Sequence, residues 1–417
     1  MYIKRTLDKQ IKKIEGIFPV ILITGPRQVG KTTILDNYRK SNKLDINYVT
    51  LDDRIQRNLA VNDPKLFLET HGTPLIIDEV QYAPELFSYI KIRVDKYRLD
   101  NINNKKKETL YYLTGSQVFN LMEDVSESLA GRVGIIDMFS LSYSEIINEE
   151  SDFFLPEYEK IKAKETRERQ DVNKVFATIL KGGYPELYSI QNEQNEIFYS
   201  TYVRTYLERD VRKIINVRNE SKFLTFMCAV AARTSQELNY SDIAKDIEID
   251  LKTVESWFSI LRTSGLVFVL QPFSNNQLKR IIKRPKFYFT DTGLACYLAG
   301  YADAKTLERS AYNGAIFENF IIMEIVKSFI NDNKDPRLYL NYYRDKDGKE
   351  VDLIITINNI IYPIEIKKSS NPGIESIKNF NVFNNIKQEI GHGGVICMIE
   401  KVTPIDGKHN YIPYQCI

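Results

Sequence analysis

The sequence predicts an α/β protein made of several linked parts, and three observations support this prediction. First, a chain of 417 residues is long enough for roughly two to four domains. Second, the first third of the chain alternates short apolar runs with helical segments, as in a sheet covered by helices. Third, the last third contains an apolar helix followed by two strand-like runs.

Composition restricts the function only weakly. Hydrophobic residues make up 43% of the chain and charged residues 27%, which is ordinary for a soluble globular protein. The net charge of +2 argues neither for nor against a nucleic-acid partner, so any basic surface has to be local. The four cysteines form no CxxC pair, so we expect neither a zinc site nor a disulfide framework.

Targeting and membrane signals are not seen in the sequence. No apolar run reaches the length of a membrane span, and the first ten residues, MYIKRTLDKQ, lack the apolar stretch of a signal peptide. We therefore expect a cytoplasmic, soluble protein without a membrane partner.

A phosphate-binding motif follows the first predicted strand, Pro19–Thr24. The next residues, GPRQVGKTT, match G-x-x-x-x-G-K-[ST] and lead into the helical ILDNYRK. Glycines let backbone N–H groups wrap around phosphate oxygens, the lysine reaches the β- and γ-phosphates, and the threonine hydroxyl ligates magnesium. A chance glycine-rich turn is the alternative, but the strand before and the helix after favour a P-loop. We expect ATP and Mg²⁺ as cofactors, bound by Gly25, Pro26, Arg27, Gln28, Val29, Gly30, Lys31, Thr32 and Thr33.

An acidic pair ends the strand predicted over PLIIDEV, residues 74–80. Carboxylates at strand ends of such a sheet face the nucleotide. Asp78 would hold magnesium through water, and Glu79 would orient or deprotonate the attacking water, which predicts hydrolysis as well as binding. The alternative is an acidic strand end in a loop, which the neighbouring P-loop disfavours.

Two further residues are candidates for the same site. Ser116 ends the strand LYYLTGS, where a polar group would sense the γ-phosphate. Arg132, in SESLAGRVG, is either an arginine finger, in cis or from a neighbouring subunit, or an exposed surface arginine. NYVTLDD is another predicted strand. Its acidic end either lines the same crevice or, as we expect, provides Asp52 as the cap of the next helix.

These motifs together resemble those of a bacterial and archaeal family of AAA-type ATPases fused to a C-terminal domain of unassigned function. The resemblance rests on GPRQVGKTT, YVTLDD, LIIDEVQ, LTGSQ, ESLAGR, GGYPE and YLERDV, and it covers most of the chain. It implies an AAA-like core with Lys31 and Thr32 at the nucleotide, Asp78 and Glu79 as the acidic pair, Ser116 as sensor and Arg132 as a candidate finger. AAA-type proteins often form rings, so the resemblance also implies a homo-oligomer as one expected state.

The middle of the chain predicts a helical lid and a winged helix. Residues 151–171 resemble an exposed helix or linker, and helical periodicity over residues 177–217 indicates the lid. Residues 240–270 give helix, turn, helix and strand, with Ser241 and Asp250 as N-caps and Gly265 as C-cap. A second strand, KFYFTDTG, follows the basic loop QLKRIIKRPK. That loop would grip a DNA backbone, or it is solvated and the unit binds protein. Its basic residues are Lys279, Arg280, Lys283, Arg284 and Lys286.

The C-terminal third predicts a second candidate site. The apolar helix over residues 314–330 precedes the strands EVDLIITI and IIYPIEIKK, which a tight turn at Asn358-Asn359 joins. Glu365 and Lys367 share one strand face, and Asp352 starts the neighbouring strand.

Two carboxylates and a lysine suit a magnesium ion that retains water and a phosphate. This is similar to the D…E-x-K pattern of restriction-endonuclease-like, or PD-(D/E)xK, nucleases, in which the first helix often supplies an acid, here Glu318. The expected metal ligands are Asp352 and Glu365. The alternatives are a cross-strand salt bridge of Glu365 with Lys367 or Lys368, or a nuclease fold that binds DNA without turnover.

The predicted organisation is an AAA-type P-loop ATPase over residues 1–140, a helical lid or linker over 141–220, a winged helix over 221–302 and a nuclease-like α/β domain over 303–417. The predicted function is an ATP-dependent DNA-processing enzyme with a magnesium-dependent nuclease-like domain. DNA would be bound through the winged helix and the C-terminal domain. The alternatives are an ATP-controlled switch that docks DNA or a protein partner without cutting, and a nucleotide-gated assembly factor.

Overall fold

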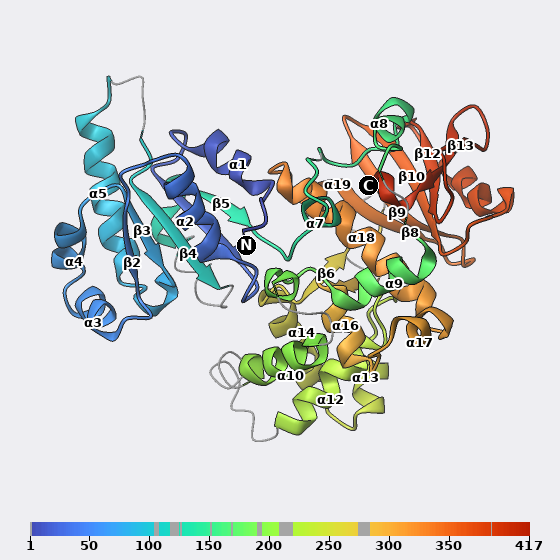
Figure 1. Cartoon of the computed structure of the whole chain (residues 1–417), viewed down its shortest axis with the longest axis horizontal. Coiled ribbons are helices and arrows are strands. Elements are labelled where there is room, and N and C mark those ends of the chain that lie inside the picture. Colours follow the sequence, from blue (N-terminus) through green and yellow to red (C-terminus); the bar gives the residue numbers. More distant parts are fainter. Residues whose placement is uncertain are drawn as a thin grey trace.

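The structure is a computed structural model, and it describes residues 2–103, 108–116, 125, 127–150, 152–167, 170–189, 194–207, 220–273, 284–384 and 386–417. These residues form an N-terminal α/β unit, a mostly helical middle and a C-terminal α/β unit (Figure 1). The α/β class predicted from the sequence is confirmed.

The N-terminal unit contains a five-stranded parallel sheet of order β2-β3-β4-β1-β5. Its strands are β1 Val20–Gly25, β2 Asn47–Thr50, β3 Leu75–Asp78, β4 Tyr111–Ser116 and β5 Val133–Asp137. Its helices are α1 Leu7–Ile14, α2 Lys31–Ser41, α3 Arg54–Asn62, α4 Pro64–His71 and α5 Leu86–Asp100. Since all five strands are parallel, their carboxyl ends lie at one edge, where the candidate nucleotide residues of β1, β3 and β4 meet.

Both faces of this sheet are buried because helices cover each of them. Along β1, Ile21 and Ile23 belong to one hydrophobic core, which α1 and α2 share. Val20 and Leu22 belong to a second core, shared with α4 and α5. Strand side chains alternate between faces, so a strand covered on both sides becomes continuously apolar. The apolar run preceding the P-loop therefore reflects a buried central strand.

The middle of the chain contains short helices and one hairpin. The helices are α7 Tyr143–Ile146, α8 Tyr158–Ala163, α9 Val172–Lys181, α10 Asn195–Tyr206, α12 Glu220–Ala231, α13 Tyr240–Asp246, α14 Leu251–Thr263, α16 Thr292–Leu298 and α17 Ala304–Arg309. The hairpin pairs β6 Val267–Leu270 with β7 Lys286–Phe289. Helix α13 packs against α12 and α14, and α14 against β6. This order of elements is the predicted one, and its assignment as a winged helix remains a prediction.

The helix caps in this region agree only in part with the sequence. Asp250 caps α14 by accepting from the Thr253 N–H, and Gly265 follows that helix with φ 72°. Helix α13, however, is capped by Asn239 and not by Ser241. Likewise Asp53, and not Asp52, caps α3. Each wrong prediction chose a neighbouring polar residue, because several adjacent residues have side chains able to cap.

Residues 151–171 were predicted to be an exposed helix or linker. The described residues of this segment do include a helix, α8, but the segment is not simply exposed. Phe154, Leu155 and Ile161 are buried. The Arg167 guanidinium donates to the Gln415 and Ile417 carbonyls, and Glu165 accepts from the Val402 N–H. Figure 1 accordingly shows α8 beside the strands of the C-terminal sheet. A few apolar residues between many charges are enough to attach this segment, which periodicity alone could not reveal.

The C-terminal unit contains a mixed sheet of order β13-β14-β12-β10-β9-β8, with β11 also paired to β10. Its strands are β8 Leu340–Arg344, β9 Glu350–Ile357, β10 Ile360–Lys367, β11 Glu389–Ile390, β12 Gly393–Cys397, β13 Thr403–Pro404 and β14 His409–Pro413. Its helices are α18 Asn313–Asn331 and α19 Pro336–Tyr339. Asn358 and Asn359 have φ of 51° and 65°, which confirms the predicted tight turn between β9 and β10.

Candidate functional site

The first candidate site surrounds the loop between β1 and α2. Gly25 has φ 149° and a side chain there would collide with the Met138 carbonyl oxygen, so only glycine fits. Gly30, with φ 96°, caps the N-terminus of α2. The Lys31 Nζ lies over the loop and donates to the carbonyls of Gly25 and Pro26, at 3.0 and 2.7 Å. The loop therefore places an ammonium and the N-terminus of a helix at one point, as phosphate binding requires.

Asp78 ends β3 directly beside the P-loop. The Thr32 hydroxyl donates to Asp78 Oδ1 at 2.7 Å, and the Thr114 hydroxyl donates to the same oxygen. The Thr50 and Tyr48 hydroxyls lie 3.4 Å from Asp78 Oδ2. The two predicted magnesium ligands of this site are thus in contact, and a hydroxyl with a carboxylate suits a hard cation.

Glu79 lies just beyond β3 and is held in a left-handed conformation, with φ 57°. Its N–H donates to the Thr114 hydroxyl at 3.1 Å, and its carboxylate accepts from the Gln81 amide. Thr114 therefore holds the Asp78 carboxylate and the Glu79 backbone. The sequence did not reveal this role because we chose the last polar residue of that strand. Ser116, the residue chosen, pairs with Gly25 across the sheet. Its buried hydroxyl has no hydrogen-bond partner among the described residues.

Arg132 does not face the P-loop of its own chain. It precedes Val133, which pairs with Val20 at the amino end of β1, whereas the P-loop leaves the carboxyl end. Its Nε and Nη2 lie 2.6 and 2.8 Å from the Asp95 carboxylate on α5. The prediction of a finger in cis is therefore wrong, since the guanidinium lies at the opposite edge of the sheet. A role across subunits stays a prediction.

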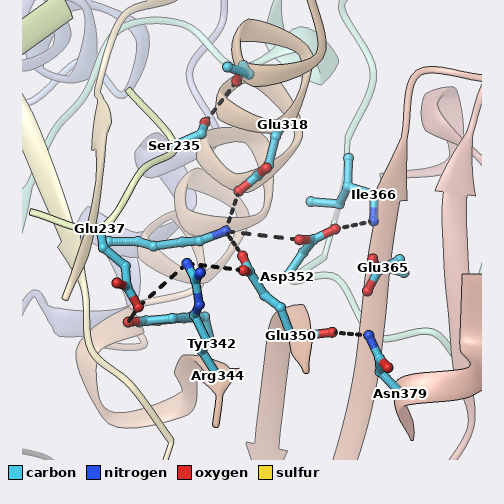
Figure 2. Close-up of polar contacts among 12 residues, drawn as sticks. Ser235, Glu237, Glu318, Tyr342, Arg344, Glu350, Asp352, Glu365, Ile366 and Asn379 are labelled. Carbon is cyan, nitrogen blue, oxygen red and sulfur yellow. Dashed lines mark hydrogen bonds and ion pairs between the residues drawn. The ribbon is translucent and has the colours of Figure 1, made fainter. Parts of the chain in front are cut away.

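The second candidate site lies where β9 and β10 run side by side in the C-terminal sheet (Figure 2). Asp352 Oδ2 accepts from the Ile366 N–H at 2.8 Å, which fixes the carboxylate against the next strand. The Lys367 Nζ lies 2.6 Å from Glu365 Oε1 and 3.9 Å from Asp352 Oδ2. The structure thus brings together the three residues of the predicted D…E-x-K pattern.

Glu318, the predicted helical acid, belongs to a neighbouring set of contacts. Its Oε1 accepts from the Tyr288 hydroxyl at 2.9 Å and from the Lys286 Nζ at 3.1 Å. The same ammonium lies 2.5 Å from Glu350 Oε1 and 3.9 Å from Asp352 Oδ1. Figure 2 shows Glu318, Glu350 and Asp352 pointing toward a common centre.

Lys286 is therefore not part of an exposed basic loop, contrary to the sequence-based prediction. Its side chain is buried, at 4% exposure, and lies among the carboxylates of Glu318, Glu350 and Asp352. It shares one face of β7 with Tyr288. Arg284 is exposed. Lys279, Arg280 and Lys283 lie outside the described residues, so the basic loop remains a prediction. The exposed side of α14 carries Lys252, Glu255 and Arg262, which is mixed in charge.

Two carboxyl groups of this cluster, those of Glu365 and Glu318, have raised pKa values. Burial, followed by the nearby Asp352, raises the pKa of Glu365 to about 8, although Lys367 opposes the shift. Burial likewise raises the pKa of Glu318 to about 7, opposed by Lys286. Burial alone would lower the pKa of Lys286, but Tyr288 and the surrounding carboxylates outweigh it and raise that pKa overall. Strongly shifted groups in one cluster are typical of functional sites.

The residues of the second site fit a magnesium ion held by few ligands and do not fit a closed cage. Among the described residues, no three His, Cys, Asp or Glu side chains are grouped closely enough to enclose a metal. Magnesium commonly uses only one or two carboxylates and keeps several waters. Glu365 Oε2 is buried and finds no hydrogen-bond partner within the described part of the chain. A buried carboxylate oxygen of this kind, beside Asp352, is suited to bind a cation.

Buried polar contacts connect the P-loop to the segment after β5. The Arg5 guanidinium donates to the Val29 carbonyl of the P-loop at 3.0 Å and to the Phe139 carbonyl at 2.7 Å. Its Nε lies 3.2 Å from Glu145 Oε1 on α7. Arg5 and Glu145 are both buried. The position of α7 is therefore tied to that of the P-loop.

The same α7 segment is tied to α18 of the C-terminal unit. The Tyr143 N–H donates to Glu324 Oε2 at 2.6 Å, and the Lys327 Nζ donates to the Leu141 carbonyl at 2.9 Å. Glu324 and Lys327 also pair with each other at 3.1 Å. Since α18 also carries Glu318, one continuous set of contacts joins the two candidate sites.

Comparison with known families supports the assignment of the first site as the nucleotide site of an ATPase. A family described as an AAA domain matches residues 18–147, and two domains of unknown function, DUF8612 and DUF4143, match residues 172–305 and 313–417. Together with the P-loop geometry, the AAA match identifies a P-loop ATPase, so this protein is an ATP-hydrolysing enzyme with a nucleotide-binding N-terminal unit. The function of the two following domains is not assigned by these matches.

Similar proteins do not narrow the function further. Two uncharacterized proteins, from Mycobacterium tuberculosis and Mycobacterium bovis, are each 27% identical over 358 residues, or 85% of this chain and 72% of theirs. A Walker-type ATPase of Pyrococcus abyssi has a TM-score of 0.42 and 13% identity, covering 71% of this chain and 96% of that one. The RuvB Holliday junction branch migration motor of Thermotoga maritima has a TM-score of 0.28 and 16% identity, covering 63% and 85%. These scores are low, and we infer nothing further from either structure.

Within the part of the chain that the structure describes, helices long and apolar enough to cross a membrane are not found.

Proposed function

We propose that this protein is an ATP-dependent DNA-processing enzyme whose C-terminal unit cuts phosphodiester bonds with the help of a magnesium ion. The observation that carries this proposal is the adjacency of Asp352, Glu365 and Lys367, together with a buried Glu365 oxygen that has no hydrogen-bond partner among the described residues. The ATPase core supplies the nucleotide dependence.

At the first site, the P-loop backbone from Gly25 to Thr33 would bind the phosphates of ATP, and Lys31 would neutralise the β- and γ-phosphates. Thr32 and Asp78 would hold Mg²⁺, because their oxygens already meet at 2.7 Å. Glu79, whose backbone is held by Thr114 and whose carboxylate accepts from Gln81, would position the attacking water. The unpartnered Ser116 hydroxyl beside Gly25 suits a γ-phosphate sensor.

At the second site, Asp352 and Glu365 would hold a magnesium ion, which when bound supplies a Lewis acid for the scissile phosphate. The Asp352 carboxylate is oriented for this by the Ile366 N–H. Lys367, in contact with both carboxylates, would orient the attacking water and stabilise negative charge on the phosphate. The predicted winged helix and the basic residues near Arg284 would bind the DNA backbone.

ATP would control this cut through the contacts that join the P-loop to α18. The P-loop carbonyl of Val29 is held by Arg5, and α18 is held through α7 by Glu324. Closing of the loop around phosphates would change the first contact, and α18 would transmit the change to Glu318 and its neighbours.

The test compares Lys367→Ala with wild-type protein on supercoiled DNA, with magnesium and ATP. The expected result is loss of cutting with ATP hydrolysis retained, because Lys367 lies far along the chain from the P-loop unit. Lys346→Ala, an exposed lysine in the turn before β9, is the matched control and should cut normally. Equal cutting by wild type and Lys367→Ala would exclude the proposed role of Lys367.

An ATP-controlled switch that docks DNA or protein without cutting is the second candidate. It is favoured by the pairing of Glu318 with Lys286 and Tyr288, which leaves fewer carboxylates for a metal. Under this alternative the same DNA would be bound but not cut by wild type. Intact ATP hydrolysis with no cutting under any metal condition would favour the switch.

A further inference from the structure

A lysine ammonium lies inside the carboxylate cluster of the C-terminal unit. Lys286 comes from the hairpin of the middle unit, yet its Nζ is 2.5 Å from Glu350 Oε1 and 3.1 Å from Glu318 Oε1. Asp352 Oδ1 lies 3.9 Å from the same nitrogen. Three carboxylates from α18 and β9 thus surround the buried ammonium of Lys286, which neutralises part of their charge.

The strand that carries Lys286 is fixed firmly to the C-terminal unit. The Asn319 amide donates to the Phe289 carbonyl and accepts from the Phe289 N–H, both at 2.8 Å. Asn319 is fully buried. The Tyr288 hydroxyl adds a bond to Glu318 at 2.9 Å. The position of Lys286 in the cluster is therefore fixed by the hydrogen bonds between β7 and α18.

The cluster has two unlike halves, with Asp352 shared between them. On one side, Asp352 Oδ1 faces the Lys286 ammonium. On the other, Asp352 Oδ2 is the oxygen nearest Lys367, and Glu365 Oε2 is buried without a partner among the described residues. Among the described residues, the second half therefore has a buried carboxylate oxygen, Glu365 Oε2, that is available to bind a cation.

We propose that Lys286 is a tethered cation that occupies the first half of the cluster, so that the cluster binds one divalent ion, through Asp352 and Glu365. Glu318 and Glu350 then hold the ammonium and do not bind the ion. The ammonium repels a second divalent ion, because two positive charges a few ångströms apart in a buried site repel strongly. The proposal deepens the proposed function, since the single ion is the one assigned there to phosphodiester cleavage.

The test counts bound Mn²⁺ by electron paramagnetic resonance on nucleotide-free full-length protein. An Asp78→Asn substitution in every sample removes the ligand at the P-loop. With Lys286 present, one tightly bound Mn²⁺ is expected. With Lys286→Met, a second Mn²⁺ is expected, because Glu318 and Glu350 then lose their counter-charge and two carboxylates are enough to bind such an ion. Lys349→Met, the same change at an exposed lysine, should leave the count at one. An unchanged count and affinity in Lys286→Met would overturn the proposal.

A second pair of variants applies if Lys286→Met does not fold, as judged by circular dichroism. Glu318→Gln should keep the single Mn²⁺, since Glu318 is assigned to Lys286, whereas Glu365→Gln should lose it. The reverse result would overturn the proposal, because Glu318 would then be an ion ligand.

The same counts separate this proposal from the proposed nuclease function. One ion with Lys286 present, and still one in Lys286→Met, would disprove the proposal that Lys286 acts as a tethered cation. The proposed nuclease function would not be affected. No ion with Lys286 present, and one in Lys286→Met, would overturn the single-ion site and with it the proposed nuclease function, although Lys286 would still occupy the first half of the cluster. No ion in either protein would remove both.

Discussion

The affinity of the C-terminal site for Mn²⁺ should depend steeply on pH. A carboxyl group has to be deprotonated before it binds a metal ion, so a raised pKa lowers the apparent affinity below that pKa. Burial and the neighbouring Asp352 raise the pKa of Glu365 to about 8. The carboxylate fraction is then about 1% at pH 6, about 9% at pH 7 and about 50% at pH 8. The apparent affinity should therefore rise roughly fiftyfold between pH 6 and pH 8.

The assay is isothermal titration of nucleotide-free protein with Mn²⁺ at several pH values. Glu365→Gln serves as the control, because the amide neither titrates nor binds the ion well, and its weak residual binding should vary little with pH. A wild-type affinity that is constant between pH 6 and pH 8 would refute the reasoning, since Glu365 would then be ionised throughout.

Without the metal, the same group should make folding stability depend on pH in the opposite sense. The pKa of Glu365 in the folded protein lies above its ordinary value of 4.5. Its contribution to stability is therefore complete below about pH 4.5 and is lost as pH rises through about 8. A bound ion favours the charged carboxylate and should remove much of this loss.

Three further predictions follow from other contacts. Lys31→Ala should abolish ATP hydrolysis, measured as phosphate release, because the only ammonium placed over the described P-loop is removed, and normal hydrolysis would disprove the nucleotide-site assignment. Asp291→Ala should lower the free energy of unfolding by about 3–5 kcal/mol in denaturant titrations, since the buried carboxylate accepts from the Gly183 N–H, the Tyr199 hydroxyl and the Leu294 N–H; a loss below about 1 kcal/mol would contradict this. Arg132→Ala should cost at most about 1 kcal/mol, because the Asp95 pair is partly exposed, and should leave nucleotide affinity of the isolated chain unchanged; weakened nucleotide binding in a monomer would restore the cis role.

The N-terminal site could be predicted closely because its signals are local. The P-loop needs a strand, a glycine turn and a helix in immediate succession, and all three lie within residues 20–41. Asp78 was found for the same reason, as the polar end of an apolar strand. Thr114 was not recognised as the residue that holds the Asp78 carboxylate and the Glu79 backbone. That role depends on β4 lying beside β3, an order that adjacent residues do not encode.

The C-terminal site was predictable only in part. A short hairpin joins the strands that carry Asp352, Glu365 and Lys367 and so brings these residues together. The two asparagines of its turn made the hairpin predictable from the sequence. Lys286 could not be recognised, since it reaches the cluster from a strand more than sixty residues earlier in the chain. Lysine is rarely buried unless paired, and the sequence around it suggested a basic loop. The alternation of Lys286 and Tyr288 on a strand was the one available signal.

The most direct test of the central claim is the conversion of supercoiled plasmid to nicked or linear DNA by wild-type protein and by Asp352→Asn. Each is assayed with Mg²⁺, with and without ATP, while ATP hydrolysis is followed in the same samples. We predict cutting by wild type that requires both Mg²⁺ and ATP, and no cutting by Asp352→Asn although it hydrolyses ATP at the wild-type rate. Intact ATP hydrolysis without any cutting by wild type, or equal cutting by Asp352→Asn, would contradict the assignment of the C-terminal carboxylates as a nuclease site.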